Sequence, residues 1–89
     1  MFDPIDCAYL KKGYIMPPHV HADHAQILLV VQGRILLRAA DRPPTELRGI
    51  AAVVCVPAGV EHSYEALEDS VLVDLRTDKV YTLAPEGGT

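Results

Sequence analysis

The residues of this chain best suited to chemistry are its four histidines: His19, His21, His24 and His62. His19 and His21 form an H-x-H pair. Side chains two positions apart in a β-strand point to the same face, so these two imidazoles can converge on one ion while Val20 points away. Imidazole suits first-row divalent metals. An isolated H-x-H pair is weak support for a metal site. Whether it indicates a site depends on the residues that surround it.

A longer pattern surrounds this pair. Gly13 stands six positions before His19, and Gln26 stands five positions after His21. Gly33 stands seven positions after Gln26. These spacings resemble the first motif of the cupin superfamily, G-x5-H-x-H-x(3,4)-E-x6-G, with Gln in place of Glu.

A second pattern, P-x-G-x-x-H, is made by Pro57, Gly59 and His62. It resembles the second cupin motif, G-x5-P-x-G-x-x-H-x3-N. Ala51 stands in place of the leading glycine, and Ala66 stands in place of the closing asparagine. Together the two motifs extend from position 13 to position 66 of the 89 residues.

The resemblance implies an all-β fold, a cupin-like jelly-roll β-barrel, with metal ligands at His19, His21, Gln26 and His62. Tight turns at the proline and glycine of the second motif would bring His62 to the interior beside the H-x-H pair. Three imidazoles and one oxygen donor suit one divalent transition metal: Mn, Fe, Co, Ni, Cu or Zn. One or two coordination positions would remain for water or substrate.

The Gln26 amide is neutral, whereas the family's Glu would bring a negative charge. A divalent ion held only by neutral donors keeps its full charge, which favours isomerisation, hydration or lyase chemistry over metal-centred oxidation. The row of ligands ending in Gln is similar to that of small cupins that open the ring of unsaturated uronates. Those carry Glu before the Gln, where this chain has Ala25. The alternative role for Gln26 is a hydrogen bond to a backbone amide, with no metal.

Three further side chains are candidates with open roles. Tyr64 shares strand parity with His62, so it is either a proton donor facing the metal or an aromatic side chain that fills the barrel. His24 fits neither ligand spacing and is expected in a turn, where it either touches substrate at the barrel mouth or is an exposed loop histidine. Cys55 is expected to be a buried structural cysteine.

The rest of the chain supports an all-β interpretation. Short runs rich in Val, Ile, Leu and Tyr alternate with turn residues, which is typical of a β-sandwich or barrel. The strands are expected at 26–31, 34–40, 52–56, 61–66, 70–76 and 80–83. We expect residues 1–12 to be an N-terminal strand segment that is exchanged or packed in a dimer. The barrel is then 13–84, and 85–89 form a loose tail.

Composition excludes two classes of partner. The 89 residues carry 8 basic and 12 acidic side chains, a net charge of −4, and no basic cluster exceeds the pair Lys11-Lys12. Such a chain is unsuited to nucleic acid. The most apolar run, 50–60, is interrupted by Pro57 and is too short to span a membrane. The N-terminus carries acidic residues where a signal peptide needs basic ones, so we expect a cytoplasmic protein with two free cysteines.

One apolar run predicts a homodimer. Residues 27–31 are apolar at every position. If Gln26 points inward, Leu28 also lines the barrel, and Ile27, Leu29 and Val31 face outward. An outward stripe of large aliphatic side chains on a small chain is typical of an interface.

The function expected from these residues is that of a metal-binding small cupin with a small-molecule ligand. The leading hypothesis is an enzyme in which the metal acts as a Lewis acid on a small oxygen-rich or anionic, sugar-like molecule. The alternatives are a metal-dependent dioxygenase and a non-enzymatic module that binds or senses a metal or sugar. The fold alone does not choose among them.

Overall fold

The structure, a computed structural model, describes residues 5–50 and 52–77, and these form eight β-strands and no helix. In chain order the strands are β1 (Ile5–Leu10), β2 (Ile15–His19), β3 (Ala25–Gln32), β4 (Arg34–Ala39), β5 (Arg42–Arg48), β6 (Ala52–Val56), β7 (His62–Ala66) and β8 (Ser70–Thr77). Within the described part, therefore, there is no helix of the length and apolarity needed to cross a membrane.

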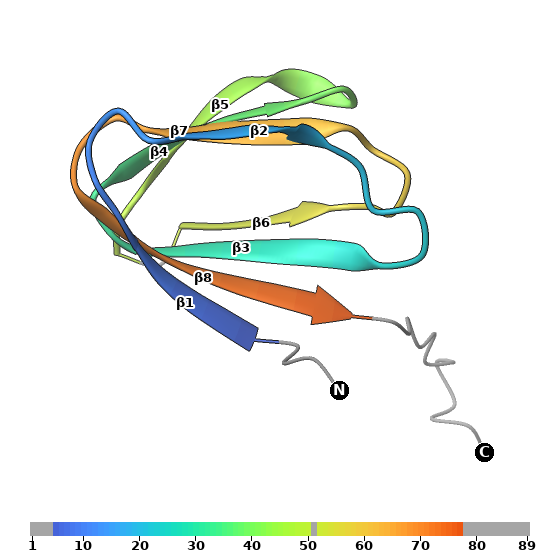
Figure 1. Cartoon of the computed structure of the whole chain (residues 1–89), viewed down its shortest axis with the longest axis horizontal. Helices are drawn as coiled ribbons and strands as arrows, with labels where there is room; N and C mark the ends of the chain where they lie inside the picture. Colours follow the sequence, from blue (N-terminus) through green and yellow to red (C-terminus); the bar gives the residue numbers. More distant parts are fainter. Residues whose placement is uncertain (1–4, 51, 78–89) are drawn as a thin grey trace, which may run out of the picture.

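The strands form two antiparallel sheets that face each other (Figure 1). The first sheet has the order β1-β8-β3-β6 and the second has the order β2-β7-β4-β5. The pairs β1–β8, β2–β7, β3–β6 and β4–β5 are nested, as if one long hairpin had been rolled up. This nesting is the jelly-roll pattern. The all-β jelly-roll expectation is therefore confirmed.

Most of the expected strands are present. The segments expected at 26–31, 34–40, 52–56, 61–66 and 70–76 correspond to β3, β4, β6, β7 and β8. The strand expected at 80–83 and the tail at 85–89 lie outside the described residues. Inside the segment 1–12, β1 pairs with β8 of the same chain. The proposed division of the chain stays a prediction.

Strand β5 is absent from the expected strands, because its first residues include two consecutive prolines, which are typical of a turn. In the structure Pro43 and Pro44 lie within β5. Proline cannot donate a hydrogen bond to a neighbouring strand, so it is tolerated mainly in edge strands. β5 lies at the edge of the second sheet, where this loss is acceptable.

The core occupies one end of the space between the sheets. Inward positions along β3 are buried and change from Val30 and Leu28 to the polar Gln26. On β7 the buried positions likewise change from Ala66 and Tyr64 to His62. The apolar residues form one cluster: Leu10, Leu28, Val30, Ile35, Leu37, Leu47, Val56, Tyr64, Ala66 and Leu72. The polar end lies where β2 and β8 end and β3 and β7 begin, and we call it the site end.

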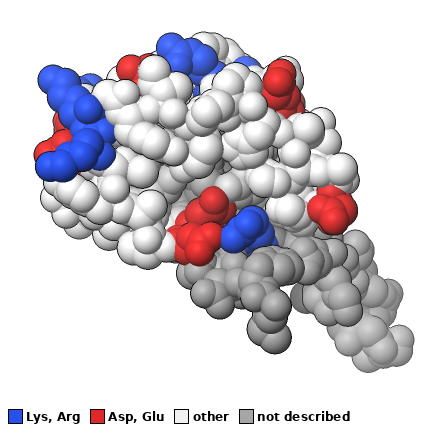
Figure 2. Space-filling view, in the orientation of Figure 1, with Lys and Arg blue, Asp and Glu red and all other residues white. Residues whose placement is uncertain are grey.

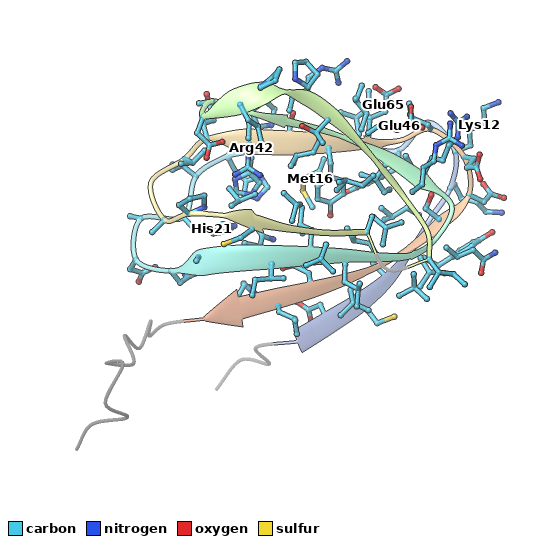
Figure 3. All side chains as sticks on the ribbon, turned by 180° about the vertical axis from the view of Figure 1, so that it is seen from behind. Lys12, Met16, His21, Arg42, Glu46 and Glu65 are labelled. Carbon is cyan, nitrogen blue, oxygen red and sulfur yellow. The ribbon has the colours of Figure 1, made fainter. Side chains whose placement is uncertain are left out.

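Arg42 links the edges of the two sheets (Figure 3). Its Nη2 donates a 2.7 Å hydrogen bond to the carbonyl oxygen of Cys55 in β6, and Asp41 accepts two hydrogen bonds from the same guanidinium. Hydrogen bonds to the Asp41 carboxylate raise the pKa of Arg42. A charged clamp therefore connects β5 to β6.

The outward side of the first sheet is apolar. Cross-strand neighbours share one face of a sheet, and the register pairs Leu29 with Val53 and Val73, and Ile27 with Cys55. Cys55 is exposed, so the expectation of a buried structural cysteine is wrong. The cause is register, because Cys55 shares the outward parity of Ile27. Both cysteines are free thiols, as expected.

Charged side chains are dispersed over the face seen in Figure 2. Basic side chains lie next to acidic ones at several places around its periphery, and most of the visible area between these places carries neither sign. This distribution agrees with the absence of a long basic run in the sequence.

The turn at Gly33 requires glycine for two reasons. Its φ is +91°, in the region that side chains rarely adopt. A Cβ at this position would also lie 2.2 Å from Ser70 Oγ and 2.5 Å from the carbonyl oxygen of Asp69. Ser70 is fully buried and its hydroxyl donates to the carbonyl oxygen of Glu68, so it has no room to move away.

We predict that Gly33→Ala destabilises the protein far more than Gly13→Ala. Gly13 has almost the same φ, +90°, but a Cβ there would meet nothing within 4 Å. The left-handed conformation alone costs about 1–2 kcal/mol, and overpacking should add about 1–3 kcal/mol at Gly33. Urea unfolding measures both. Equal losses in the two variants would contradict the crowding argument.

Candidate metal centre

Three of the four histidines meet at the site end. His19 ends β2, His62 begins β7, and His21 lies in the loop after β2. One ligand atom from each lies within 4.8 Å of the others. The ring centroids are 4.3 Å apart for His19 and His62, 4.8 Å for His19 and His21, and 5.4 Å for His21 and His62. Figure 3 shows His21 at this end of the sheets.

The H-x-H pair converges without lying in one regular strand. β2 ends at His19, so His21 stands beyond it, and the pairing of β2 with β7 shifts between Met16 and His19. Pro17 and Pro18 occupy that interval. Prolines have no N–H to give to a ladder, so a register shift at this point is expected. His19 and His21 do approach each other, as expected. They do not do so as alternate residues of one strand, because His21 lies beyond the end of β2.

Backbone carbonyls orient two of the rings. His19 Nδ1 lies 2.9 Å from the carbonyl oxygen of Pro17, and His62 Nδ1 lies 3.0 Å from that of Val60. A carbonyl only accepts, so each Nδ1 carries the hydrogen and each neutral ring keeps its lone pair on Nε2. Metal-binding histidines are commonly held in this way.

Gln26 lies between His62 and an aspartate. Its side chain is buried, and its Nε2 donates a 2.5 Å hydrogen bond to Asp74 Oδ2. A carboxylate cannot donate, so the amide nitrogen must face Asp74 and the amide oxygen must face His62. Gln26 Oε1 lies 2.7 Å from His62 Nε2. Both contacts are with side chains rather than with a backbone amide.

The contact between Gln26 and His62 brings two acceptors together. With the His62 hydrogen on Nδ1, a lone pair of Nε2 faces a lone pair of Oε1 at 2.7 Å. Such a contact is stabilised by positive charge, either a second proton on His62 or a metal ion within reach of both atoms. The donor set of three imidazoles and one amide oxygen therefore fits a divalent transition metal.

Asp74 is the functional candidate that sequence reasoning missed. It lies on β8, and its Oδ1 is buried with no hydrogen-bond partner among the described residues. Along this strand the apolar Val71, Val73 and Leu75 alternate with a second side that carries Asp74 and Arg76. This alternation gives no indication of which face points inward. In the structure the polar face points inward at the site end, because Asp74 hydrogen-bonds the buried Gln26.

The pKa of His21 is lowered. Burial is the largest cause, followed by the positive charges of His24, His19 and His62, while Asp74 opposes the shift. His21 Nε2 is buried without a partner among the described residues. A neutral imidazole with a lone pair is the form that binds a metal.

His24 is not an exposed loop histidine. Its side chain is only 16% exposed, its ring centroid lies 4.5 Å from that of His21, and its Nδ1 lies 2.9 Å from Asp23 Oδ1. It remains outside the group formed by the other three histidines. The expectation that His24 does not belong with the other three histidines is therefore met, but its side chain is more buried than expected.

Tyr64 is buried, and burial raises its pKa to about 12, with smaller contributions from Tyr14 and Asp74. Its ring belongs to the apolar cluster and lies 6.5 Å from that of Tyr14. A phenol with this pKa stays protonated at neutral pH, so it can donate a proton but cannot act as a base. The packing role is therefore established, and the proton-donating role stays a prediction.

Comparison with solved structures identifies the fold family. No protein-family model and no curated protein matches the sequence. The structure of KdgF from Halomonas sp. is similar, with 27% identity and a TM-score of 0.77 over 90% of this chain and 76% of that chain. An RmlC-like cupin from Shewanella frigidimarina NCIMB 400 has 23% identity and a TM-score of 0.75, over 84% of this chain and 65% of that chain. The chain has the fold of a small single-domain cupin.

Another neighbour of this cupin is named as a sugar-nucleotide enzyme. The dTDP-4-dehydrorhamnose 3,5-epimerase from Sulfolobus tokodaii is 25% identical, with a TM-score of 0.70 over 88% of this chain and 52% of that chain. The cupin described here thus spans less than two thirds of the Shewanella protein and about half of the epimerase.

We predict a loss of stability above pH 10 that depends on Tyr64. The pKa of Tyr64 rises from 10.0 to about 12 in the folded cupin. Between these values the unfolded chain loses the phenol proton and the folded chain keeps it. Unfolding then releases a proton, so the free energy of unfolding falls as pH rises. In the Tyr64→Phe variant the free energy of unfolding, measured by urea titrations from pH 9 to 12, should fall less steeply with pH. Identical slopes would show that burial does not raise this pKa.

Proposed function

We propose that this cupin binds one divalent transition metal through His19, His21, His62 and Gln26, and that it is an enzyme acting on a small anionic, sugar-like molecule. The observation that carries the proposal is the approach of the three histidine ligand atoms to within 4.8 Å. The facing lone pairs of His62 and Gln26 add to it. When bound, the metal would polarise a carbonyl or hydroxyl oxygen of the substrate.

The chain itself supplies groups that can move protons. Asp74 Oδ1 is a buried acceptor without a partner among the described residues, so a substrate hydroxyl can satisfy it. Accepting that proton makes Asp74 the general base. Tyr64 lies two positions from His62 on the same face of β7 and holds its proton at neutral pH, which suits it to donate one. A site that offers both a proton acceptor and a proton donor suits isomerisation or ring opening.

Two observations favour a sugar-like substrate. One neighbour at 25% identity is named as an epimerase of a deoxysugar nucleotide. The Gln-terminated row of histidines is also similar to that of cupins that open unsaturated uronates. All four proposed ligands are neutral, so the ion would attract an anionic oxygen. The cytoplasmic location expected from the sequence stays a prediction.

We predict that the purified cupin binds one equivalent of metal and that His62→Ala loses it. Removing a residue that only orients a ligand commonly costs about 10–100-fold in affinity, so removing a ligand should cost at least about 100-fold. Competition titration with Co²⁺ or Zn²⁺ measures this. His24→Ala is the matched control and should keep the metal, because His24 lies outside the cluster. Unchanged affinity in His62→Ala would exclude the site.

The same preparations separate the three functional classes. We expect metal-dependent incorporation of deuterium from D₂O, or ring opening, when unsaturated and saturated uronates are followed by proton NMR. Asp74→Asn should abolish this activity while retaining the metal. Oxygen uptake without exchange would instead identify a dioxygenase. Tight metal binding with neither activity on any uronate would favour a binding module.

We also propose that two copies of this cupin pack through the apolar outward side of the first sheet. The outward residues of its four strands are all uncharged: Cys7, Tyr9, Ile27, Leu29, Val31, Val53, Cys55, Val71, Val73 and Leu75. Tyr9 is 59% exposed and Val53 is 61% exposed. A chain of net charge −4 repels its own copy least at an uncharged face. The apolar surface available for a dimer is therefore larger than the expected stripe of Ile27, Leu29 and Val31, because it includes residues from all four strands of the first sheet.

We predict that Leu29→Lys dissociates this dimer, because it would bury a charge between two apolar sheets. Leu36→Lys is the control. Leu36 belongs to the second sheet, where its cross-strand neighbours are Glu46 and Glu65, which would pair with the new lysine. Sedimentation velocity at micromolar concentration should give a monomer for the first variant and a dimer for the control. A monomeric wild-type protein would contradict the proposal.

A further inference from the structure

The site end contains two buried polar atoms that are not among the proposed metal ligands. Asp74 Oδ1 and His24 Nε2 are buried, and neither has a hydrogen-bond partner among the described residues. Leaving a buried acceptor unpaired costs free energy, because the atom has lost its hydrogen bonds to water. An unpaired buried polar group at a functional site is therefore evidence for a donor that enters from outside the chain.

Asp23 determines which nitrogen of His24 accepts a hydrogen bond. His24 Nδ1 lies 2.9 Å from Asp23 Oδ1. A carboxylate cannot donate, so Nδ1 carries the hydrogen and the lone pair of the neutral ring is on Nε2. The side chain of Asp23 is 89% exposed, whereas that of His24 is 16% exposed. The pair therefore keeps its carboxylate in solvent and its accepting nitrogen in the interior.

His24 is held beside the candidate metal centre. Its ring centroid lies 4.5 Å from that of His21. The carbonyl oxygen of His21 accepts a 2.7 Å hydrogen bond from the N–H of Gly59, so the loop that carries both rings is attached to the turn before β7. The charge of His24 lowers the pKa of His21 and the charge of Asp74 raises it. Both groups therefore lie close to the same proposed ligand.

We propose that His24 Nε2 and Asp74 Oδ1 accept hydrogen bonds from two hydroxyl groups of the ligand, so that the site selects a polyhydroxy compound and His24 is a specificity-determining residue. The inference rests on the proposed function, because it places a further oxygen of the ligand at the metal. His24 lies outside the group of three histidines, so it can contact the ligand while the others hold the ion.

A hydroxyl is the ligand group that suits both acceptors. It donates one hydrogen bond, whereas a ketone, ether or carboxylate oxygen only accepts and would place lone pair against lone pair. A methyl or methylene group in the same place would leave both acceptors buried and unpaired. A site that hydrogen-bonds a substrate hydroxyl discriminates strongly against the analogue that lacks it. The two acceptors therefore distinguish sugar-like ligands from apolar ones of the same size.

The test compares D-erythronate with (R)-2-hydroxybutanoate by NMR titration of metal-free and Zn²⁺-loaded protein. These acids share a carbon skeleton, a carboxylate and one hydroxyl, and they differ only in the hydroxyls on carbons 3 and 4. We expect erythronate to bind about tenfold more tightly or better. The imidazole ¹⁵N resonances report the contact directly. His24 Nε2 should move to lower frequency when erythronate is added and stay in place with 2-hydroxybutanoate.

Two variants at position 24 separate hydrogen bonding from packing. His24→Phe keeps a ring against His21 and removes the acceptor. It should weaken erythronate binding about five- to tenfold and leave 2-hydroxybutanoate and the metal unchanged. His24→Gln is the matched control, because it retains an acceptor, and it should recover part of the lost affinity. Equal losses for the two acids in His24→Phe would show that the ring only packs, and would overturn the proposal.

The outcomes distinguish this inference from the proposed function. If the protein takes up no Zn²⁺, the proposed function fails, but a preference of the metal-free protein for erythronate that His24→Phe removes still supports the two acceptors. Equal affinity for the two acids, no measurable binding of erythronate to either form, or an unmoved His24 Nε2 resonance would each overturn the inference. Metal binding and turnover of a uronate would in that case stand unaffected.

Discussion

The arrangement of the site depends on one amide held between two side chains. Gln26 Nε2 donates to Asp74, and this single hydrogen bond determines which end of the amide faces His62. If the amide were reversed, its NH₂ group would face His62 and one proposed oxygen ligand would be lost. The contact joins β3 and β8 of the first sheet to β7 of the second. It is therefore also the polar link across the space between the two sheets at this end.

The fold keeps that link in place by dividing the interior into two parts. Along β3 and β7 the inward side chains change from large apolar residues to Gln26 and His62 within one or two alternations. The apolar part supplies the burial that holds the sheets together, and Leu28, Ile35 and Leu37 are completely buried. The polar part would be unstable alone, because its buried acceptors His21 Nε2 and Asp74 Oδ1 have no partner among the described residues. Stability and chemistry are thus located at opposite ends of the same strands.

Much of this arrangement can be predicted from the sequence. Fixed spacings in the two motifs predicted that His19, His21 and His62 would converge, and strand parity predicted that Gln26 and Leu28 point inward. These features are local, so a linear pattern contains them. The inward direction of Asp74 is different. It depends on which side of β8 the second sheet covers. The alternation of side chains along a strand does not show which of its two sides that is. The same ambiguity explains the wrong expectation for Cys55.

The neighbourhood of Asp74 also explains the substitution of Gln for the family's Glu in physical terms. A Glu at position 26 would bring a second carboxylate against Asp74, whose oxygen already lies 2.5 Å from the side chain at that position. Two carboxylates this close cannot both be ionised, so one would take up a proton. The amide avoids this conflict because it donates a hydrogen bond to Asp74 and still presents an oxygen to His62. The amide at position 26 and the carboxylate of Asp74 are therefore coupled by one hydrogen bond, and a change in either residue alters the surroundings of the other.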